Sequence, residues 1–290
     1  MKERTRTIGI IGTGRVARAL ALGFARRPEV RLHAWGRSPA RAGALVTGMD
    51  GSTVHAGLAD LVAACDTIAI AVADDAMAMV IAGITAAPLG HRPFVFHASG
   101  GSGTAILEPL RRLGARTAAV HPAMTFTGDP AIEVERMAAA CFAVTGSDPQ
   151  ATAEGLAIVR MLGGSPVEVA EQHRTLYHAA LCHGANHLVT LIAGSLGALA
   201  RAGLEDPAAV LAPLVRAALD NSLASGLGAL SGPVSRGDAG TVRGHLDAIA
   251  REVPELLPAY RAMASATLDA MERQAMPTAT DLREALDEGS

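Results

Sequence analysis

The sequence predicts an α/β protein in two parts, with a doubly wound, mainly parallel sheet in the N-terminal domain and an all-α C-terminal domain. Up to about residue 170, short apolar segments typical of strands alternate with helical patterns. This alternation is typical of a parallel sheet covered by helices on both faces. From residue 171 onward only helical patterns follow. We therefore expect the domains to span residues 1–170 and 171–290.

A glycine-rich turn follows the first expected strand. The apolar run over residues 7–11 breaks at Gly12 and Gly14, and a helical pattern begins directly afterwards. Such a turn presents backbone N–H groups and the positive end of a helix dipole, which is where a dinucleotide pyrophosphate binds. Gly12 permits the turn, Gly14 admits the phosphates, and Ala17 replaces the third glycine where helix packs on strand. We expect a Rossmann dinucleotide-binding domain rather than an ordinary glycine-rich turn, with cofactor contacts from Gly12, Thr13, Gly14, Arg15 and Val16.

The second expected strand, residues 30–35, indicates which dinucleotide binds. In NAD sites an Asp or Glu about 20 residues past the glycines holds the ribose 2′-hydroxyl, and this sequence has none there. Arg37, Ser38 and Arg41 instead offer two guanidinium groups and a hydroxyl, and arginine binds phosphate through paired donors. We therefore expect NADP rather than NAD. The alternative is a solvated turn in a chain that uses arginine throughout.

The other elements of the first domain follow in order. Expected strands cover residues 66–72, 93–97, 116–120, 141–144 and 165–169, and expected helices cover residues 58–64, 77–84, 106–113 and 150–162. Ligands bind beyond the carboxyl ends of the strands in such sheets, so the turns after Val72, His97 and Val120 should line one crevice. Ala73, Asp74 and Asp75 are cofactor-binding candidates on this ground. For the two aspartates the alternative is a helix N-cap.

The second domain should be dominated by one long helix. Residues 171–202 contain no proline and are apolar or small nearly all round, a length of about 48 Å at 1.5 Å per residue. A helix this apolar must be covered on most sides, which predicts a homodimer. Further helices are expected at residues 207–223, 238–252 with Asp238 as N-cap, and 258–273; residues 225–238 are glycine-rich, and the polar tail after residue 277 should fray.

Composition excludes several classes of protein. A formal charge of −3 gives no field to attract nucleic acid, and no apolar stretch is long enough to span a membrane. The N-terminus enters a strand without a signal-peptide core, so we expect a soluble, cytoplasmic protein. The three cysteines should be buried apolar residues, since they are too few and scattered for a disulfide framework or zinc site. We expect no metal site.

Lysine is nearly absent, which limits the choice of proton donor. Lys2 is the only lysine, and arginine does not release a proton near neutral pH. On the long helix, offsets of four place His178, Cys182 and Asn186 on nearly one face, with His183 beside them. Imidazole moves its proton near neutral pH, although a single histidine is more often a packed or interface residue.

Two turns after expected strands add to these candidates. His121 follows one strand and Ser99 follows the strand before it, both at the carboxyl ends where ligands collect. The alternatives are a histidine that caps a strand end and a tight turn. The catalytic candidates are therefore His183, His178, Asn186, His121 and Ser99.

These features together resemble a known arrangement. The features are the Rossmann half, Ala73-Asp74-Asp75, Ser99-Gly100, His121-Pro122, Tyr177-His178, Asn186 and the segment Gly232-Pro233-Val234-Ser235-Arg236-Gly237-Asp238. The sequence resembles a bacterial family in which a Rossmann-like domain precedes a domain of unknown function. That family is related to 6-phosphogluconate dehydrogenase, pyrroline-5-carboxylate reductase, the deazaflavin-dependent NADP reductases and prephenate dehydrogenase. The resemblance implies an NADP-linked reductase or dehydrogenase whose helical domain forms a homodimer.

The sequence departs from these relatives in two places. β-Hydroxyacid dehydrogenases of the superfamily have a lysine four residues before an asparagine on the long helix, where this chain has Cys182 before Asn186. Prephenate dehydrogenases have a His-Pro pair after a strand and a Ser-His pair on the helix, which this chain matches only in part. The resemblance to the first group therefore does not carry the lysine mechanism with it.

The resulting hypothesis is an NADP-dependent oxidoreductase that moves a hydride between nicotinamide and a small carbonyl, imine or hydroxyl substrate. His183 or His178 would be the proton donor and Asn186 would orient the substrate. One alternative is a non-catalytic NADP-binding sensor or partner-binding protein, which needs no proton donor. A second is a prephenate dehydrogenase-like enzyme.

Overall fold

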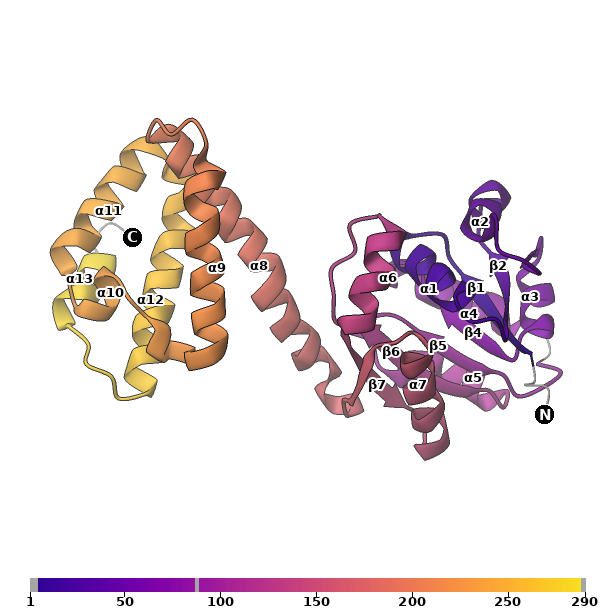
Figure 1. The fold of residues 1–290 in the computed structure, drawn as a ribbon. Coiled ribbons are helices and arrows are strands. Elements are labelled where there is room, and N and C mark those ends of the chain that lie inside the picture. Colours follow the sequence, from indigo (N-terminus) through magenta and orange to yellow (C-terminus); the bar gives the residue numbers. More distant parts are fainter. Residues whose placement is uncertain (1–4, 87–88, 288–290) are drawn as a thin grey trace. The chain divides into compact units, whose positions relative to one another are not determined.

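The computed structural model describes residues 5–86 and 89–287, and Figure 1 traces the chain. The chain divides into two compact units, Met1–Cys182 and His183–Ser290, and the division falls within one helix, α8 (Arg174–Arg201). The expected domain boundary between residues 170 and 171 stays a prediction.

The first unit is built on a sheet of eight strands among the described residues, in the order β3-β2-β1-β4-β5-β6-β7-β8. The strands are β1 (Arg6–Ile11), β2 (Val30–Trp35), β3 (Thr53–Val54), β4 (Thr67–Ile70), β5 (Phe94–His97), β6 (Arg116–Pro122), β7 (Cys141–Gly146) and β8 (Ser165–Glu168). Every neighbouring pair is parallel except β6 and β7, which are antiparallel. The strand order reverses at β1, between β2 and β4, which is where such sheets bind ligands. The expected mainly parallel, doubly wound sheet is confirmed.

Helices cover both faces of this sheet (Figure 1). The helices on one face are α1 (Arg15–Ala25), α2 (Pro39–Val46), α6 (Pro130–Ala139) and α7 (Pro149–Met161), and those on the other are α3 (Leu58–Ala64), α4 (Asp74–Thr85) and α5 (Glu108–Arg112) with the 3₁₀ turn η1 (Thr104–Leu107). All four residues of β4 and all four of β5 are buried. Strands covered on both sides have no polar face, which explains why they read as unbroken apolar runs.

The second unit is all helical, as expected. Its elements are most of α8, then α9 (Pro207–Ser225), η3 (Gly226–Ala229), α10 (Pro233–Arg236), α11 (Ala239–Glu252), η4 (Pro254–Leu256), α12 (Leu257–Arg273) and α13 (Thr280–Asp287). A small core joins α11, α12 and α13 through Val242, Leu246, Leu268 and Leu282. Asp238 is the N-cap of α11, where its carboxylate accepts a hydrogen bond from the Thr241 amide at 2.9 Å.

Several elements differ from the expectations. The tail after residue 277 does not fray throughout, because α13 buries Leu282 and Leu286 in the small core. The glycine-rich segment 225–238 contains two short helices, η3 and α10. The strand expected at residues 66–72 ends at Ile70, and the long helix begins at Arg174 after the 3₁₀ turn η2 (Glu171–His173).

The expectation that all three cysteines are buried is wrong for two of them. Cys65 is buried, Cys141 is exposed at the start of β7, and Cys182 is half-buried. Cys141 is the first residue of β7 and is exposed, while the four residues after it are buried. Among residues 5–86 and 89–287, no helix is both long and apolar enough to cross a membrane.

The glycine turn gives a direct test of the fold. Gly12 has a φ of +120°, and an added Cβ would lie 2.2 Å from the Ala71 carbonyl oxygen, whereas a Cβ on Gly14 would meet nothing within 4 Å. We expect Gly12→Ala to lower the free energy of unfolding by more than about 2 kcal/mol, and the matched Gly14→Ala change to lower it by less than about 1 kcal/mol. Urea unfolding measures both. Equal losses would contradict the strain assigned to Gly12.

Candidate functional site

The turn between β1 and α1 is shaped by close contact with the neighbouring strands. The Gly12 amide donates to the Trp35 carbonyl at 3.0 Å, and the Ala71 amide donates to the Ile11 carbonyl at 2.8 Å. Gly12 thus lies directly against the chain that leaves β4, where no side chain fits. The constraint is the one expected of a strand that turns at once into a helix at the reversal of strand order.

Gly14 is the N-cap of α1, and no side chain caps this helix. The first amides of a helix lack partners within the helix, so this end is suited to binding an anion. Arg15 donates from Nη1 to the Phe126 carbonyl at 3.1 Å, which joins the turn to the loop after β6. A Cβ on Gly36 would lie 2.7 Å from Cγ2 of Thr13, so the turns after β1 and β2 are in contact.

The turn after β2 holds two arginines in the open. Ser38 is the N-cap of α2, where its hydroxyl accepts from the Arg41 amide at 3.4 Å. Arg37 and Arg41 are both exposed, and the guanidinium of neither forms a hydrogen bond or salt bridge within the described residues. Two guanidinium groups therefore remain available beside a turn that contacts the glycine turn. The hydroxyl of Ser38 has a structural role that the sequence did not reveal.

The turn after β4 corrects one interpretation. Ala73, not an aspartate, is the N-cap of α4, and Asp74 and Asp75 are the first two residues of the helix. The N-cap alternative for these aspartates is therefore wrong. Both are exposed in the first turn, where a negative charge is favoured by the helix dipole. Whether residues 73–75 contact a cofactor stays a prediction.

A buried arginine organises the other half of the candidate site. Arg174, the first residue of α8, is 1% exposed. Its guanidinium donates to the carbonyl oxygens of Ser99 (2.8 Å), Ser102 (3.2 Å) and Ala143 (3.3 Å) and to the Thr145 hydroxyl (3.4 Å). All four acceptors are neutral. The guanidinium thus ties the turn after β5 and strand β7 to the start of α8.

The turn after β5 is fixed from a second side by His97. The Ser99 amide donates to Nδ1 of His97 at 3.2 Å, and Nε2 lies 2.9 Å from the Gly103 carbonyl. Nδ1 therefore accepts and Nε2 carries the proton, so the ring is neutral. Burial lowers the pKa of His97 to about 4, and the Arg174 charge acts in the same direction. Ser99 itself is buried, and its hydroxyl accepts from the Ser102 amide at 3.3 Å.

The histidines at 121 and 178 meet over this turn. His121 and His178 pack edge to face with ring centroids 5.8 Å apart. A Cβ on Gly100 would lie 2.5 Å from Cδ2 of His178 and 2.8 Å from Nε2 of His121. Glycine is therefore required at position 100 for the two rings to rest on the backbone. The structure brings together three of the five predicted catalytic residues: Ser99, His121 and His178.

Tyr177 completes this cluster. Its hydroxyl lies 3.0 Å from Nδ1 of His121, and Cζ of Arg174 lies 5.8 Å from the centre of the Tyr177 ring. Burial lowers the pKa of His121 to about 4, with further lowering by the charges of Arg174, His178 and His97. Burial also raises the pKa of Tyr177. At neutral pH the pair is thus an uncharged imidazole beside a protonated phenol, an arrangement that can hold and pass a proton.

The remaining predicted residues of α8 fall into separate pairs. Sγ of Cys182 lies 3.6 Å from Nε2 of His178, at the end of the first unit. His183 and Asn186 belong to the second unit, where both are exposed and Nδ1 of His183 lies 3.0 Å from Nδ1 of His187. A role for His183 and Asn186 stays a prediction.

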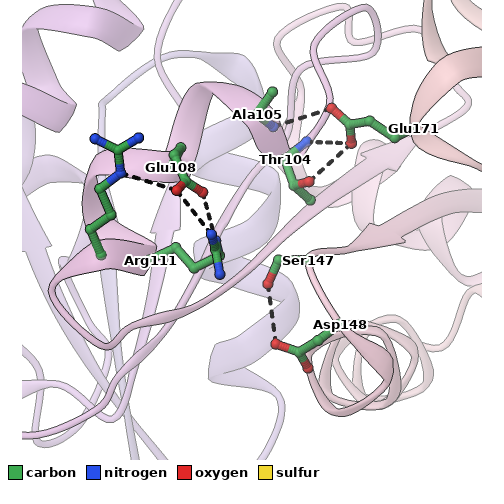
Figure 2. Close-up of polar contacts among 8 residues, drawn as sticks. Thr104, Ala105, Glu108, Arg111, Ser147, Asp148 and Glu171 are labelled. Carbon is green, nitrogen blue, oxygen red and sulfur yellow. Dashed lines mark hydrogen bonds and ion pairs between the residues drawn. The ribbon is translucent and has the colours of Figure 1, made fainter.

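Glu171 holds the segment that follows the turn after β5. Figure 2 shows its carboxylate accepting from the Thr104 amide (2.7 Å), the Thr104 hydroxyl (3.0 Å) and the Ala105 amide (3.1 Å). Burial opposes ionisation, but these hydrogen bonds keep the pKa of Glu171 below its usual value. Glu171 and Arg174 therefore attach the beginning of α8 to one loop from two points.

Sequence reasoning did not single out Arg174 or Glu171, and it assigned no catalytic role to His97 or Tyr177. One signal was available for Arg174. It stands three residues before Tyr177, so both lie on one side of the helix that carries the histidines. Burial of the guanidinium depends on contacts with distant segments, which no local pattern contains. Over the described ranges, no group of three or more His, Cys, Asp or Glu side chains could hold a metal ion.

Comparisons with known proteins agree with this architecture. Residues 1–122 match the family model for a Rossmann-like domain, and residues 140–267 match that for a domain of unknown function, DUF2520. No curated protein sequence matches the chain.

Solved structures share the fold at low sequence identity. A reductive aminase from Aspergillus terreus in complex with NADPH and ethyl-5-oxohexanoate is 17% identical, with a TM-score of 0.72 over 98% of this chain and 99% of that one. An imine reductase from Myxococcus stipitatus in complex with NADP⁺ is 17% identical, with a TM-score of 0.69 over 97% and 99%. A pyrroline carboxylate reductase from Plasmodium falciparum with NADP bound is 15% identical, with a TM-score of 0.59 over 99% of each chain.

The two family matches are consecutive and together cover most of the sequence, which confirms the resemblance on which the sequence analysis relied. The chain therefore combines a Rossmann-like domain with the domain of unknown function DUF2520.

Proposed function

We propose that the protein is an NADP-dependent oxidoreductase that acts on a small carbonyl, imine or hydroxyl substrate. One observation carries the proposal: the uncapped glycine turn at the start of α1 contacts a turn with two unpaired arginines. Similar folds that were solved with NADP or NADPH support the same cofactor.

The residues present fit this cofactor. A Cβ on Gly14 would meet nothing within 4 Å, and among the described residues no side chain caps the first amides of α1, so a pyrophosphate has donors there. Arg37 and Arg41 supply paired donors for a 2′-phosphate, and no acidic residue stands beside them to hold a 2′-hydroxyl. When bound, the cofactor supplies a hydride acceptor or donor at its nicotinamide ring.

The chain's own contribution would be a proton at a fixed position. The Tyr177 hydroxyl is the group placed to give or take that proton, because its pKa is raised and it lies against Nδ1 of His121. His121 stays neutral and can exchange a proton with the phenol, while its other nitrogen faces the Gly100 backbone. Ser99 is held by the buried guanidinium and by His97, which fixes the turn beside them. This cluster favours an enzyme over a sensor, which needs no such relay.

A homodimer belongs to the same proposal. Only Arg174 is buried in α8, and no residue is buried in α9. Large apolar side chains stand exposed along both helices, among them Leu176, Val189, Leu214 and Leu223. Exposed apolar surface of this extent is typical of an interface. A second copy of the chain would cover it.

The cofactor preference is testable by binding. We expect NADPH to bind at least tenfold more tightly than NADH, a difference of about 1.4 kcal/mol, because two guanidinium groups face a 2′-phosphate that NADH lacks. Fluorescence titration measures both affinities. Arg37→Gln with Arg41→Gln should remove most of the difference, and Arg112→Gln, remote from this turn, should leave it intact. Equal affinities in the wild type would contradict the assignment of NADP.

The proton relay is testable by turnover. We expect an alanine change in at least one of His121, His178 and His183 to lower turnover by about 10²–10⁴-fold with NADPH affinity nearly unchanged, since a positioned acid contributes a factor of this size. His91→Ala is the control, because His91 lies before β5, at the opposite end of that strand from His97, and its Nε2 lies 2.7 Å from the Cys65 carbonyl oxygen. Undiminished turnover in all three variants would favour the sensor.

The oligomeric state is testable by light scattering. We expect a dimer at micromolar concentration, and we expect Leu214→Asp with Leu223→Asp to shift it toward monomer by placing charges in the apolar surface. Met79→Asp introduces the same charge at an exposed methionine of α4 and should leave the dimer intact. A wild-type monomer would show that the apolar faces of α8 and α9 are not an interface.

A further inference from the structure

The proposed proton relay lies beside a buried positive charge. Arg174 is buried, is bound only by neutral oxygens, and has no carboxylate as a hydrogen-bond or salt-bridge partner in the described part of the chain. A charge with little access to water interacts more strongly with its surroundings than one at the surface. Cζ of Arg174 lies 5.8 Å from the Tyr177 ring, so the charge acts directly on the group that carries the proton.

The nearby carboxylates do not neutralise this charge at the relay. Glu171 is bound to the Thr104 and Ala105 amides and is exposed. Asp74 is exposed in the first turn of α4. Asp74 and Glu171 both favour the protonated form of His97, and Glu171 also acts on Arg174, but neither carboxylate is among the groups that shift the pKa of His121. The groups that act on His121 are Arg174 on α8, His178 on α8 and His97 on β5, and all three disfavour a positive charge there.

Two histidines report this bias, His97, which is buried, and His121, which is half-buried. The pKa values of His97 and His121 are both lowered to about 4, by burial first and by the Arg174 charge in addition. A ligand group beside His121 experiences the same burial and the same guanidinium. The cationic form of such a ligand group is therefore disfavoured, for the same reasons that disfavour the imidazolium of His121. An oxyanion at the same place is stabilised by the positive charge of Arg174.

We propose that the site is selective for substrates whose reacting atom becomes a negatively charged oxygen, a carbonyl or alcohol, and against those that react as a protonated imine. The inference rests on the proposed function and names the substrate class within it. In carbonyl reduction the carbon takes up the hydride that the cofactor supplies, the C=O π pair becomes a lone pair on oxygen, and a proton completes the alcohol. The Tyr177 hydroxyl gives that proton, the phenolate recovers one from Nδ1 of the neutral His121 ring, and a proton from solvent then replaces the one that the imidazole has lost.

The first test measures binding and needs no turnover. Acetate, acetamide and acetamidinium have nearly the same shape and carry charges of −1, 0 and +1. The imidazole signals of His121, followed by NMR at pH 7 in the full-length protein, report their binding. We expect acetate to bind at least tenfold more tightly than acetamidinium, with acetamide between them, and we expect acetate to raise the pKa of His121 by linkage.

Two variants assign this preference to the buried charge. Arg174→Gln should reduce the acetate to acetamidinium ratio below threefold and raise the pKa of His121. Arg112→Gln removes the same charge from a side chain that is 77% exposed and paired with Glu108. This change should alter neither the acetate to acetamidinium ratio nor the pKa of His121. Should Arg174→Gln fail to fold, Arg174→Lys replaces it: a buried ammonium can lose its proton, so the acetate to acetamidinium ratio of this variant should fall as the pH is raised, whereas the wild-type ratio should hold. Equal binding of the three probes by the wild type, or tighter binding of acetamidinium, would overturn the inference.

The second test separates this inference from the proposed function. With NADPH, we expect kcat/KM for butanal to exceed that for the cyclic imine 1-pyrroline by at least tenfold at pH 7. Faster reduction of 1-pyrroline would overturn the substrate class and leave the oxidoreductase standing. Failure to bind NADPH would overturn the proposed function, and the probe series would still decide whether the site selects anions.

Discussion

The buried guanidinium of Arg174 is the interaction on which the candidate site depends. Its four acceptors lie 29 to 75 residues away in the sequence, in the turn after β5, the loop beyond it and strand β7. Leaving any of these donors unpaired would expose a charge to an apolar interior, which costs several kcal/mol. The three segments therefore have one arrangement that satisfies the guanidinium. Tyr177 and His178 follow Arg174 within one helical turn, so their positions are set by the same arrangement.

The two halves of the site use different physics, and this explains what the sequence could predict. The cofactor turn works through backbone geometry, so its requirements appear as residue types at fixed spacing: Gly12 at a positive φ, and Ala17 where α1 packs on the sheet. The substrate half works through a buried charge that many segments share. In the sequence nothing distinguishes Arg174 from the many other arginines of the chain, and only the folded structure shows that it is buried.

The same distinction holds for the fold. The alternation of strands and helices was readable because each covered strand is an apolar run. The strand order and the antiparallel direction of β7 could not be predicted from the sequence, because both depend on pairings between distant segments. The helix α6 was missed although Asp129 caps it and Pro130 begins it. On α8, four-residue spacing correctly predicted neighbouring side chains, but His178 pairs with Cys182 while His183 pairs with His187.

The structure shows why arginine rather than lysine suits position 174. A buried lysine would relieve its own desolvation by losing a proton, because its pKa falls readily in an apolar setting. Burial lowers the pKa of Arg174 too, but a guanidinium stays protonated across the working range of proteins. The positive charge behind Tyr177 is therefore permanent. The titrating groups of the site are then His121, Tyr177 and the ligand itself, and each of them titrates in a field whose sign pH does not change.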